Sequence, residues 1–306
     1  MSARPVVVGT DGSEESLRAV DWATHVAARR ALPLRIITVT AAPDRPPGRP
    51  GAPLTSDDLL RNVYADALHT TAGHAAGMAP GLAIETELLS GPPGRILAAD
   101  ASAAAILVVA ASGVGGYGER SAGPVSRYVA DHAACPVVVF RDHGAAVYGE
   151  VVAGVEDPED SAGVLEFAFA EAALRGARLR AVHAWHWASA LPWPAHPHAA
   201  HGQHEKRRGG VLTATMHRPD SRGQSSQTAA RLAEVLNAWR QKYPRVPVSP
   251  MVMHGQPGKV LASFSGHADL TVIGRRPHAS WHASHSPTLH ALLNHAEGSV
   301  AVIPSA

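Results

Sequence analysis

The chain has 306 residues, of which 45% are apolar and 17% are charged, and its formal net charge is +1. One typical domain needs fewer residues, so we expect two domains. The small net charge gives no electrostatic reason to expect a nucleic acid or a membrane surface as a partner.

No run of residues approaches the ~18–20 uncharged apolar positions of a membrane-spanning helix, and the N-terminus lacks an apolar segment of signal-peptide length. The single cysteine, Cys135, excludes a disulfide bond within the chain and fits a reducing compartment. We therefore expect a cytoplasmic protein without a membrane partner. We interpret Cys135 as a small, half-buried side chain rather than a reactive one.

Short apolar strands alternate with helices along the first half of the chain. In order, we expect a strand within 5–11, a helix over 16–30, a strand over 34–40, a turn and helix at 90–97, a strand over 105–110, and a final helix and strand within 128–140. The second half repeats them at 150–156, 161–175, 179–185, 254–261, 270–274 and 291–303. The ordered matches predict an internal duplication, with a first domain over 1–143 and a second over 149–306.

The spacing between matched segments grows after 179–185, so the second copy carries an insertion. We place it at about 188–228, a stretch rich in proline, histidine, glycine and serine, and expect a long surface loop there. Its counterpart at 41–53 is shorter.

The order of elements predicts two tandem α/β domains, each an open parallel five-stranded sheet flanked by helices, in a Rossmann-like arrangement. Ligands of such sheets bind at the carboxyl ends of the strands, where the strand order reverses. Candidate site residues should therefore follow the first strand, at Thr10 and Asp11, and the fourth strand, at 111–123.

The loop after the fourth strand is rich in glycine. Its five glycines are Gly113, Gly115, Gly116, Gly118 and Gly123. Glycine lets backbone N–H groups approach an anion closely, and the helix that begins near residue 124 offers its positive N-terminal end. Strand, glycine loop and helix N-terminus together predict a phosphate-binding loop.

This loop, within a duplicated α/β chain, resembles that of the universal stress protein family, which has an adenine nucleotide alpha hydrolase-like fold. ATP-binding members of the family carry Gly, two residues, Gly, nine residues, and then Gly-Ser or Gly-Thr after the fourth strand. Gly113 and Gly123 occupy the second and third glycine positions. Ala110 replaces the first glycine and Pro124 replaces the Ser or Thr, which adds a methyl group and removes an N–H donor and a hydroxyl.

The resemblance implies further site residues. Asp11 would lie near the adenosine, the backbone of Val39 would contact adenine, and Ser126 matches a serine common in the family. The full predicted site is Thr10, Asp11, Val39, Val109, Ala110, Gly113, Gly115, Gly116, Gly123, Pro124, Val125 and Ser126.

The second copy departs further from the pattern. Glu156 stands in place of Asp11, and Pro277 and Pro287 interrupt the loop, although Arg275 and Arg276 could still attract phosphate. We therefore expect one nucleotide per chain, or none, and a structural role for the second copy.

The resemblance implies a stress-associated protein that binds ATP, with Mg²⁺ on the phosphates, and acts as a nucleotide-dependent regulatory or interaction module. It is not expected to be an enzyme. A nucleotide-free interaction scaffold and a weak ATP hydrolase are the alternatives. The family pairs its last strands across dimers, so 137–140 and 300–303 should pair within this chain as an internal pseudo-dimer, and a homodimer of whole chains stays open.

Other motifs carry less weight. Gly113, Gly115 and Gly118 also fit the dinucleotide pattern G-x-G-x-x-G, but there the helix begins within the glycine run. The segment 255–259 lacks the spacer of a phosphate-binding P-loop. Histidines crowd the insertion without a convergent ligand set, and we do not expect a physiological metal site.

Overall fold

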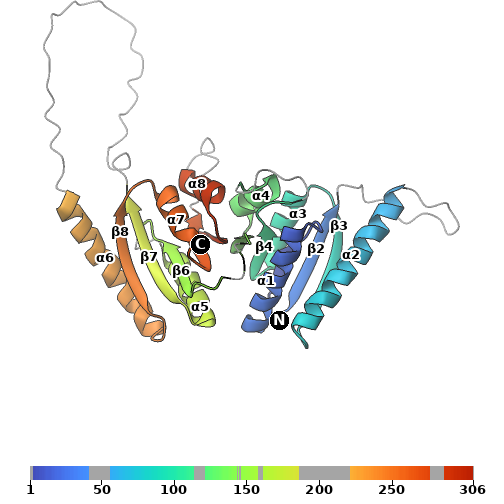
Figure 1. The fold of residues 1–306 in the computed structure, drawn as a ribbon, viewed down its shortest axis with the longest axis horizontal. Coiled ribbons are helices and arrows are strands. Elements are labelled where there is room, and N and C mark those ends of the chain that lie inside the picture. The colour runs from blue at the N-terminus through green and yellow to red at the C-terminus, as the bar shows by residue number, and fades with distance from the viewer. Residues whose placement is uncertain are drawn as a thin grey trace, which may run out of the picture.

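The computed structural model describes residues 3–40, 56–113, 121–142, 144, 146–157, 161–185, 221–275 and 286–305. The first half contains β1 (Val6–Gly9), α1 (Glu14–Arg30), β2 (Leu34–Thr40), α2 (Ser56–Met78), β3 (Ile84–Ser90), α3 (Pro93–Asp100), the 3-10 turn η1 (Ala101–Ala103), β4 (Ile106–Ala110), α4 (Pro124–His132) and β5 (Val137–Phe140). The second half contains β6 (Glu150–Gly154), α5 (Ala162–Arg175), β7 (Arg178–Trp185), α6 (Ser221–Lys242), β8 (Val248–His254), α7 (Pro257–Ser265), β9 (Leu270–Arg275), α8 (Pro287–His295) and β10 (Val300–Pro304). The same order of elements occurs twice, as Figure 1 shows.

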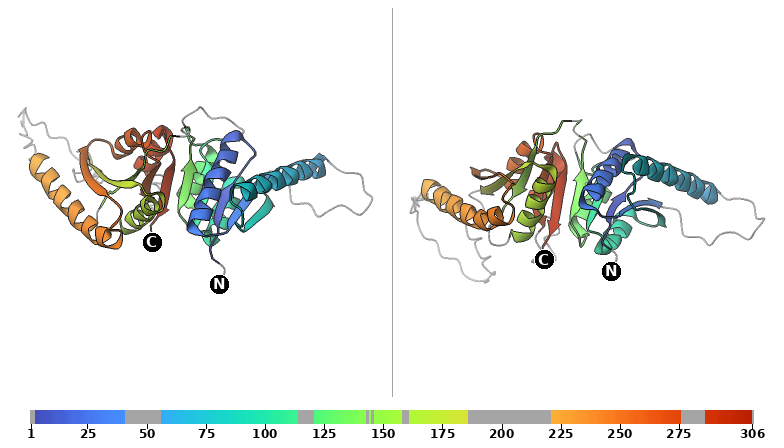
Figure 2. Two further views of the ribbon diagram at one scale, coloured as in Figure 1. Left: turned by 60° about the horizontal axis from the view of Figure 1, so that its bottom comes forward. Right: turned by 90° about the horizontal axis from the view of Figure 1, so that it is seen from below.

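The strands of the described residues form one sheet in the order β3-β2-β1-β4-β5-β10-β9-β6-β7-β8. Pairing within each half is parallel. The halves are joined by β5 and β10, which pair antiparallel with Val138 opposite Ala301. Figure 2 shows these two strands side by side at the centre of the molecule. The expected pairing of last strands within the chain is confirmed, so two five-stranded sheets become one.

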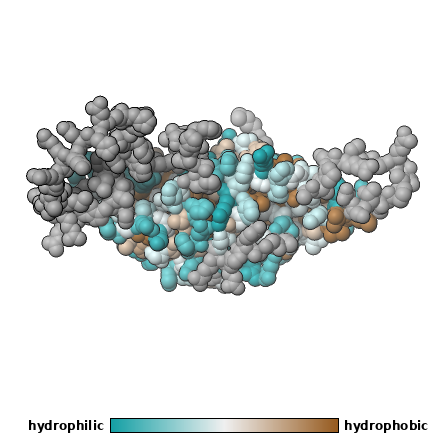
Figure 3. Space-filling model, turned by 90° about the horizontal axis from the view of Figure 1, so that it is seen from above, coloured by the Kyte–Doolittle hydropathy of each residue, from teal (hydrophilic) through white to brown (hydrophobic). Residues whose placement is uncertain are grey.

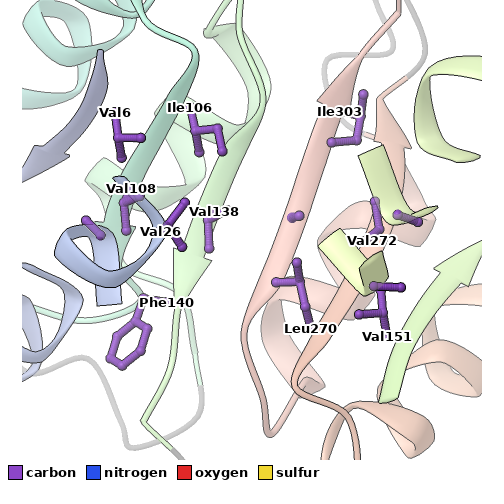
Figure 4. Close-up of a cluster of buried hydrophobic side chains, with 14 of the residues drawn as sticks. Val6, Val26, Ile106, Val108, Val138, Phe140, Val151, Leu270, Val272 and Ile303 are labelled. Carbon is purple, nitrogen blue, oxygen red and sulfur yellow. The ribbon is translucent and has the colours of Figure 1, made fainter. Parts of the chain in front are cut away.

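Side chains alternate between the two faces of this sheet. Val6 and Val8 face one hydrophobic cluster, to which α1, α2, α5 and α6 contribute. Val7 faces the other cluster, which contains residues of α3, α4, α7 and α8. Each cluster contains residues of both halves, whereas the outermost strands β3 and β8 have only half-buried and exposed residues. Figure 4 shows part of the first cluster, with Val108 and Val272 on opposite sides of the junction.

The start of α1 is fixed by local chemistry. Ser13 is the N-cap and its hydroxyl accepts a hydrogen bond from the Ser16 N–H at 3.3 Å. Glu14 and Glu15 lie in the first turn and arginines lie in the last turn, an arrangement that complements the helix dipole. The helix therefore begins two residues before the expected start.

The loop predicted at 188–228 is too long at its C-terminal end, because α6 begins at Ser221. Leu232 and Leu236, one helical turn apart, are fully buried and hold α6 against the sheet. The first turns of α6 are rich in serine and glutamine, so no pattern in the sequence signals that the helix begins there. Residues 186–220 and 41–55 lie outside the described part of the chain.

The surface of α2 is unusually apolar near its start. Leu59, Leu60 and Val63 are each more than half exposed, and Figure 3 shows hydrophobic residues gathered at this outer end of the first half, with hydrophilic residues at the centre of the same face. No helix in the described ranges is both long and apolar enough to cross a membrane.

Candidate functional site

A cavity of about 260 Å³ opens at the carboxyl ends of β1 and β4. These two strands are neighbours in the sheet, yet the chain leaves β1 toward β2 and leaves β4 toward β5, in opposite directions. The strand order reverses at this point, which is where ligands of open α/β sheets bind. The cavity thus lies where the order of elements predicted a site.

The cavity gathers most of the site residues predicted from the sequence. Those that line it are Thr10, Asp11, Val39, Val109, Ala110, Gly113, Gly123, Pro124, Val125 and Ser126. Gly115 and Gly116 lie outside the described residues. Ala111 and Ser112 also line it and fall in the segment 111–123 where the site was expected. The remaining lining residues were not predicted: Gly9, Ser16, Ile37, Pro93 and Leu97.

One wall of the cavity is apolar. Ile37 and Val39 are two residues apart on β2 and therefore point to the same side of the sheet, so strand periodicity could have identified Ile37. Leu97 comes from α3. A β-carbon at Gly9 would lie 2.9 Å from a methyl carbon of Leu97, so glycine at the end of β1 allows α3 to close against the sheet.

The opposite wall is polar and is held by hydrogen bonds. The Thr10 and Ser16 hydroxyl oxygens are 2.9 Å apart, and Thr10 Oγ1 accepts from the Gly12 N–H at 3.2 Å. Asp11 Oδ1 accepts from the Ser13 N–H at 3.0 Å and from the Ser13 hydroxyl at 2.6 Å. The Asp11 carboxylate is thereby fixed beside the N-terminus of α1.

Gly113 and Asp11 fit together closely. A β-carbon at Gly113 would come well inside 3.0 Å of Asp11 Oδ2, a separation that real β-carbons do not show. Glycine is therefore required at 113 if Asp11 keeps its position. This steric relation gives a reason, independent of any ligand, for the glycine that the sequence pattern singled out.

Gly123 caps the start of α4, which begins at Pro124. The Gly123 N–H donates to the Ala111 carbonyl at 2.7 Å, and the Ser126 hydroxyl lies 3.0 Å from both the Ala111 and the Gly123 carbonyl oxygens. Proline suits the first helical position because its missing N–H has no intrahelical acceptor there. The N–H groups of Val125 and Ser126 likewise have no acceptor within the helix, and both residues line the cavity.

Ser112 is held by a residue that sequence reasoning missed. Glu15, in the first turn of α1, accepts hydrogen bonds at Oε2 from the Ser112 hydroxyl and from the Ser112 N–H, the latter at 3.2 Å. A negative charge therefore lies directly against the loop that follows β4. No local pattern links positions 15 and 112, and only the fold brings them together.

A family model described as the universal stress protein family matches residues 2–141 and 148–304. The chain belongs to the universal stress protein family. Universal stress protein Rv2005c of Mycobacterium tuberculosis is 30% identical over 279 residues, covering 88% of this chain and 86% of the relative.

Two solved universal stress proteins are similar to this chain to different extents. One from Archaeoglobus fulgidus matches 98% of this chain and 96% of its own, with a TM-score of 0.67 and 15% identity. Another, solved in complex with cAMP, is 31% identical, covers 45% of this chain and 97% of its own, and has a TM-score of 0.34.

In this universal stress protein, Arg275 of the second copy does not serve the phosphate role considered from the sequence. Its guanidinium donates to the Ala130 carbonyl at 3.1 Å and to the Ala133 carbonyl at 2.8 Å. Burial lowers the pKa of this guanidinium, and the nearby Asp131 carboxylate offsets part of that effect. Arg275 thus binds the C-terminal end of α4 in the first copy, which also suits the helix dipole. Pro277 lies outside the described residues.

Two further expectations concern single side chains. Cys135 is buried, more deeply than expected from the sequence. Burial raises the pKa of its thiol to about 11, so little thiolate forms at neutral pH and the side chain is poorly reactive. Within the described ranges, no three His, Cys, Asp or Glu side chains come together as a possible metal site. The histidines at 196–204 lie outside those ranges.

Proposed function

We propose that this universal stress protein binds an adenine nucleotide, ATP, in the cavity of the first copy, and that occupancy of the site regulates conformation or partner choice. The proposal rests on one observation. A single cavity has an apolar wall, formed by β2, β4 and α3, and is also lined by the N-terminal end of α4. An apolar wall suits a planar base, and free helix N–H groups suit phosphate.

The residues present fit such a ligand. The base would lie against Ile37, Val39 and Val109, which supply apolar surface. Asp11, fixed by Ser13, would accept hydrogen bonds from ribose hydroxyls, because a carboxylate is an acceptor only.

The phosphates would meet the N-terminal end of α4. A β-carbon at Gly123 would have only ordinary contacts, the nearest being 3.5 Å to the Ala111 carbonyl oxygen. Packing within the chain therefore does not by itself require glycine at 123, and a close approach of the phosphates to the backbone would give a reason for it. The N–H groups of Val125 and Ser126 follow directly in the first turn of α4.

Mg²⁺ would depend on the nucleotide. The described residues offer no group of three metal-binding side chains, whereas Mg²⁺ in nucleotide sites is often held by one or two carboxylates together with the phosphates. The ion would thus arrive with ATP and be held mainly by its phosphates.

We propose a binding role rather than catalysis. Hydrolysis needs a base that can orient water. Asp11 is engaged by Ser13, and Glu15 is engaged by Ser112. Asp11 is proposed to bind the ribose, and Glu15 is not among the residues that line the cavity, so neither is placed to orient a water at the phosphates and turnover should be slow at most.

Isothermal titration calorimetry of the whole chain with ATP, cAMP, GTP and adenosine tests this proposal. We expect about one ATP per chain and weaker binding of GTP. Gly123→Val places two methyl groups in the proposed phosphate space and should abolish measurable ATP binding. Gly73→Val on α2, where a β-carbon meets nothing within 4 Å, is the matched control and should bind as the wild type does.

Three results would contradict the proposal. Absence of binding at millimolar ATP favours a nucleotide-free scaffold. Phosphate release well above background while ATP is bound favours a hydrolase. Unchanged ATP affinity in Gly123→Val would show that the phosphates lie elsewhere.

A further inference from the structure

The second copy reaches directly into the end of the loop that precedes α4. The C-terminal turn of α8 provides two acceptors there. The Leu293 carbonyl lies 3.4 Å from the Ala122 N–H, and Asn294 Oδ1 lies 3.3 Å from the Ser121 hydroxyl. Ser121 and Ala122 immediately precede Gly123, so these contacts lie next to the proposed phosphate space.

Arg127 strengthens the same connection from within α4. Its Nη2 atom donates to Asn294 Oδ1 at 2.7 Å and to the Ser121 hydroxyl at 2.7 Å. Asn294 Oδ1 is thus a shared acceptor for the loop and for the first turns of α4. A hydrogen bond from a charged donor is stronger than a neutral one.

The other end of α4 is also held by the second copy, through Arg275 and the carbonyls of Ala130 and Ala133. One helix of the first copy is therefore bound at both ends by side chains of the second. Only its N-terminal end lines the cavity, so Asn294 acts close to the site and Arg275 acts from a distance.

We infer that the second copy is a positioning module for the nucleotide site of the first, with Asn294 as the positioning residue for the phosphate-binding end of α4. This inference rests on the proposed function. Through Arg127 and Ser121, Asn294 sets the direction of the N–H groups of Val125 and Ser126, and so controls phosphate affinity without touching the ligand. Because coupling is reciprocal, bound nucleotide would in turn stabilise the contact between the copies.

The fold does not depend on Asn294. The copies are also joined by the β5–β10 strand pair and by two hydrophobic clusters that contain residues of both. Asn294 itself is only partly buried. A variant at this position should fold, which makes the inference testable.

Asn294→Ala is compared with the wild type for binding of ATP and of adenosine, which lacks phosphates. We expect the affinity for ATP to fall about five- to tenfold, because only part of the free energy of one charge-assisted hydrogen bond passes to the phosphates, and the affinity for adenosine to stay within twofold. Asn294→Asp keeps an oxygen at the shared acceptor position and pairs its new charge with the Arg127 guanidinium. It should recover part of the ATP affinity, and more of it as added salt screens the new charge from the phosphates. Asn237→Ala removes a 2.8 Å hydrogen bond from Arg240 on α6, and this matched control should change neither affinity.

The outcomes separate the two claims. If Asn294→Ala lowers the affinities for ATP and for adenosine equally, the positioning role is overturned. An equal loss would mean that the variant disturbs the whole site in the first copy rather than its phosphate-binding end. Unchanged ATP affinity in that variant would overturn it as well, while leaving the proposed function intact. A wild-type chain that binds neither ligand would overturn the proposed function and this inference with it.

Discussion

The Asp11 carboxylate occupies the space that a side chain at position 113 would need, so Gly113 and Asp11 are sterically matched across the mouth of the cavity. Moving Asp11 away would strain the hydrogen bonds that its Oδ1 atom accepts from the Ser13 N–H and the Ser13 hydroxyl. A glycine in the loop after β4 therefore fixes the position of an acid at the end of β1.

Gly113→Ala should displace Asp11 and lower ATP affinity about tenfold, since the ribose would lose its acceptor. Calorimetry measures the loss, and far-UV circular dichroism checks that the chain stays folded. In an Asp11→Ala background the clash is absent, so adding Gly113→Ala should change ATP affinity less than twofold. If the two losses simply add, the steric match between these residues does not govern binding.

Glu15→Gln should raise ATP affinity. The Glu15 carboxylate lies against the Ser112 N–H and hydroxyl, and a negative charge near the proposed phosphate site repels the ligand by roughly 1 kcal/mol at a few ångströms in water. Glutamine retains an oxygen acceptor and removes the charge, so we expect about a fivefold gain.

The gain from Glu15→Gln should shrink as salt is added, because added ions screen exposed charges. Glu14→Gln is the control, since Glu14 lies in the same turn and pairs with Arg18 instead. Equal effects of the two substitutions, or a loss of affinity in Glu15→Gln, would show that the Glu15 contact supports the loop rather than opposing the ligand.

The sequence predicted the scaffold of the site well, and physical reasons explain what it missed. Repeated apolar runs of strand length, with helical stretches between them, determine a parallel sheet and hence the edge at which ligands bind. Gly113 and Gly123 follow from the resemblance of the loop to the glycine pattern of the universal stress protein family. Glu15, by contrast, reaches Ser112 only after folding, and nothing in either local segment signals that contact.

The contacts between the copies were equally hidden. Pairing of β5 with β10 was expected from the family resemblance and is present. The role of Arg275 was misjudged, because an arginine after a strand suggests phosphate, whereas here it reaches the end of α4. Which acceptor a long side chain finds depends on how the two halves meet, and local sequence does not encode that.

Alkaline pH should destabilise the chain through Cys135. Burial raises the pKa of its thiol from 9.0 to about 11, so the folded state keeps its proton where the unfolded chain loses it. The contribution of the Cys135 thiol to the free energy of unfolding is fully present below pH 9.0. It is lost as the pH rises toward about 11, by at most about 1.4 kcal/mol per pH unit.

Urea unfolding at several pH values measures this effect, with Cys135→Ala as the comparison. We expect the difference in urea midpoint between wild type and variant to change across this pH window, while thiol labelling of the folded wild type at pH 8 stays slow. Rapid stoichiometric labelling of the folded chain would contradict the assignment.

Glu171→Ala should weaken the attachment of the two copies on the face opposite α4. Glu171, on α5, is 2% exposed and accepts hydrogen bonds from Arg30 of the first copy and from Arg175 at 2.8 Å. Its removal leaves two partly buried cations without their shared acceptor, which should cost about 3 kcal/mol in the free energy of unfolding.

The comparison that isolates this cost is Glu166→Ala. Glu166 also lies on α5 and pairs with Lys242, but the side chains of that pair are 58% and 54% exposed, so its loss should cost under about 0.5 kcal/mol. Both variants are measured by urea unfolding. A similar small shift for the two would mean that the β5–β10 pairing and the shared clusters hold the copies together without Glu171. A large decrease in the free energy of unfolding for Glu171→Ala alone would show that the charged contact between α1 and α5 helps to hold the two copies together.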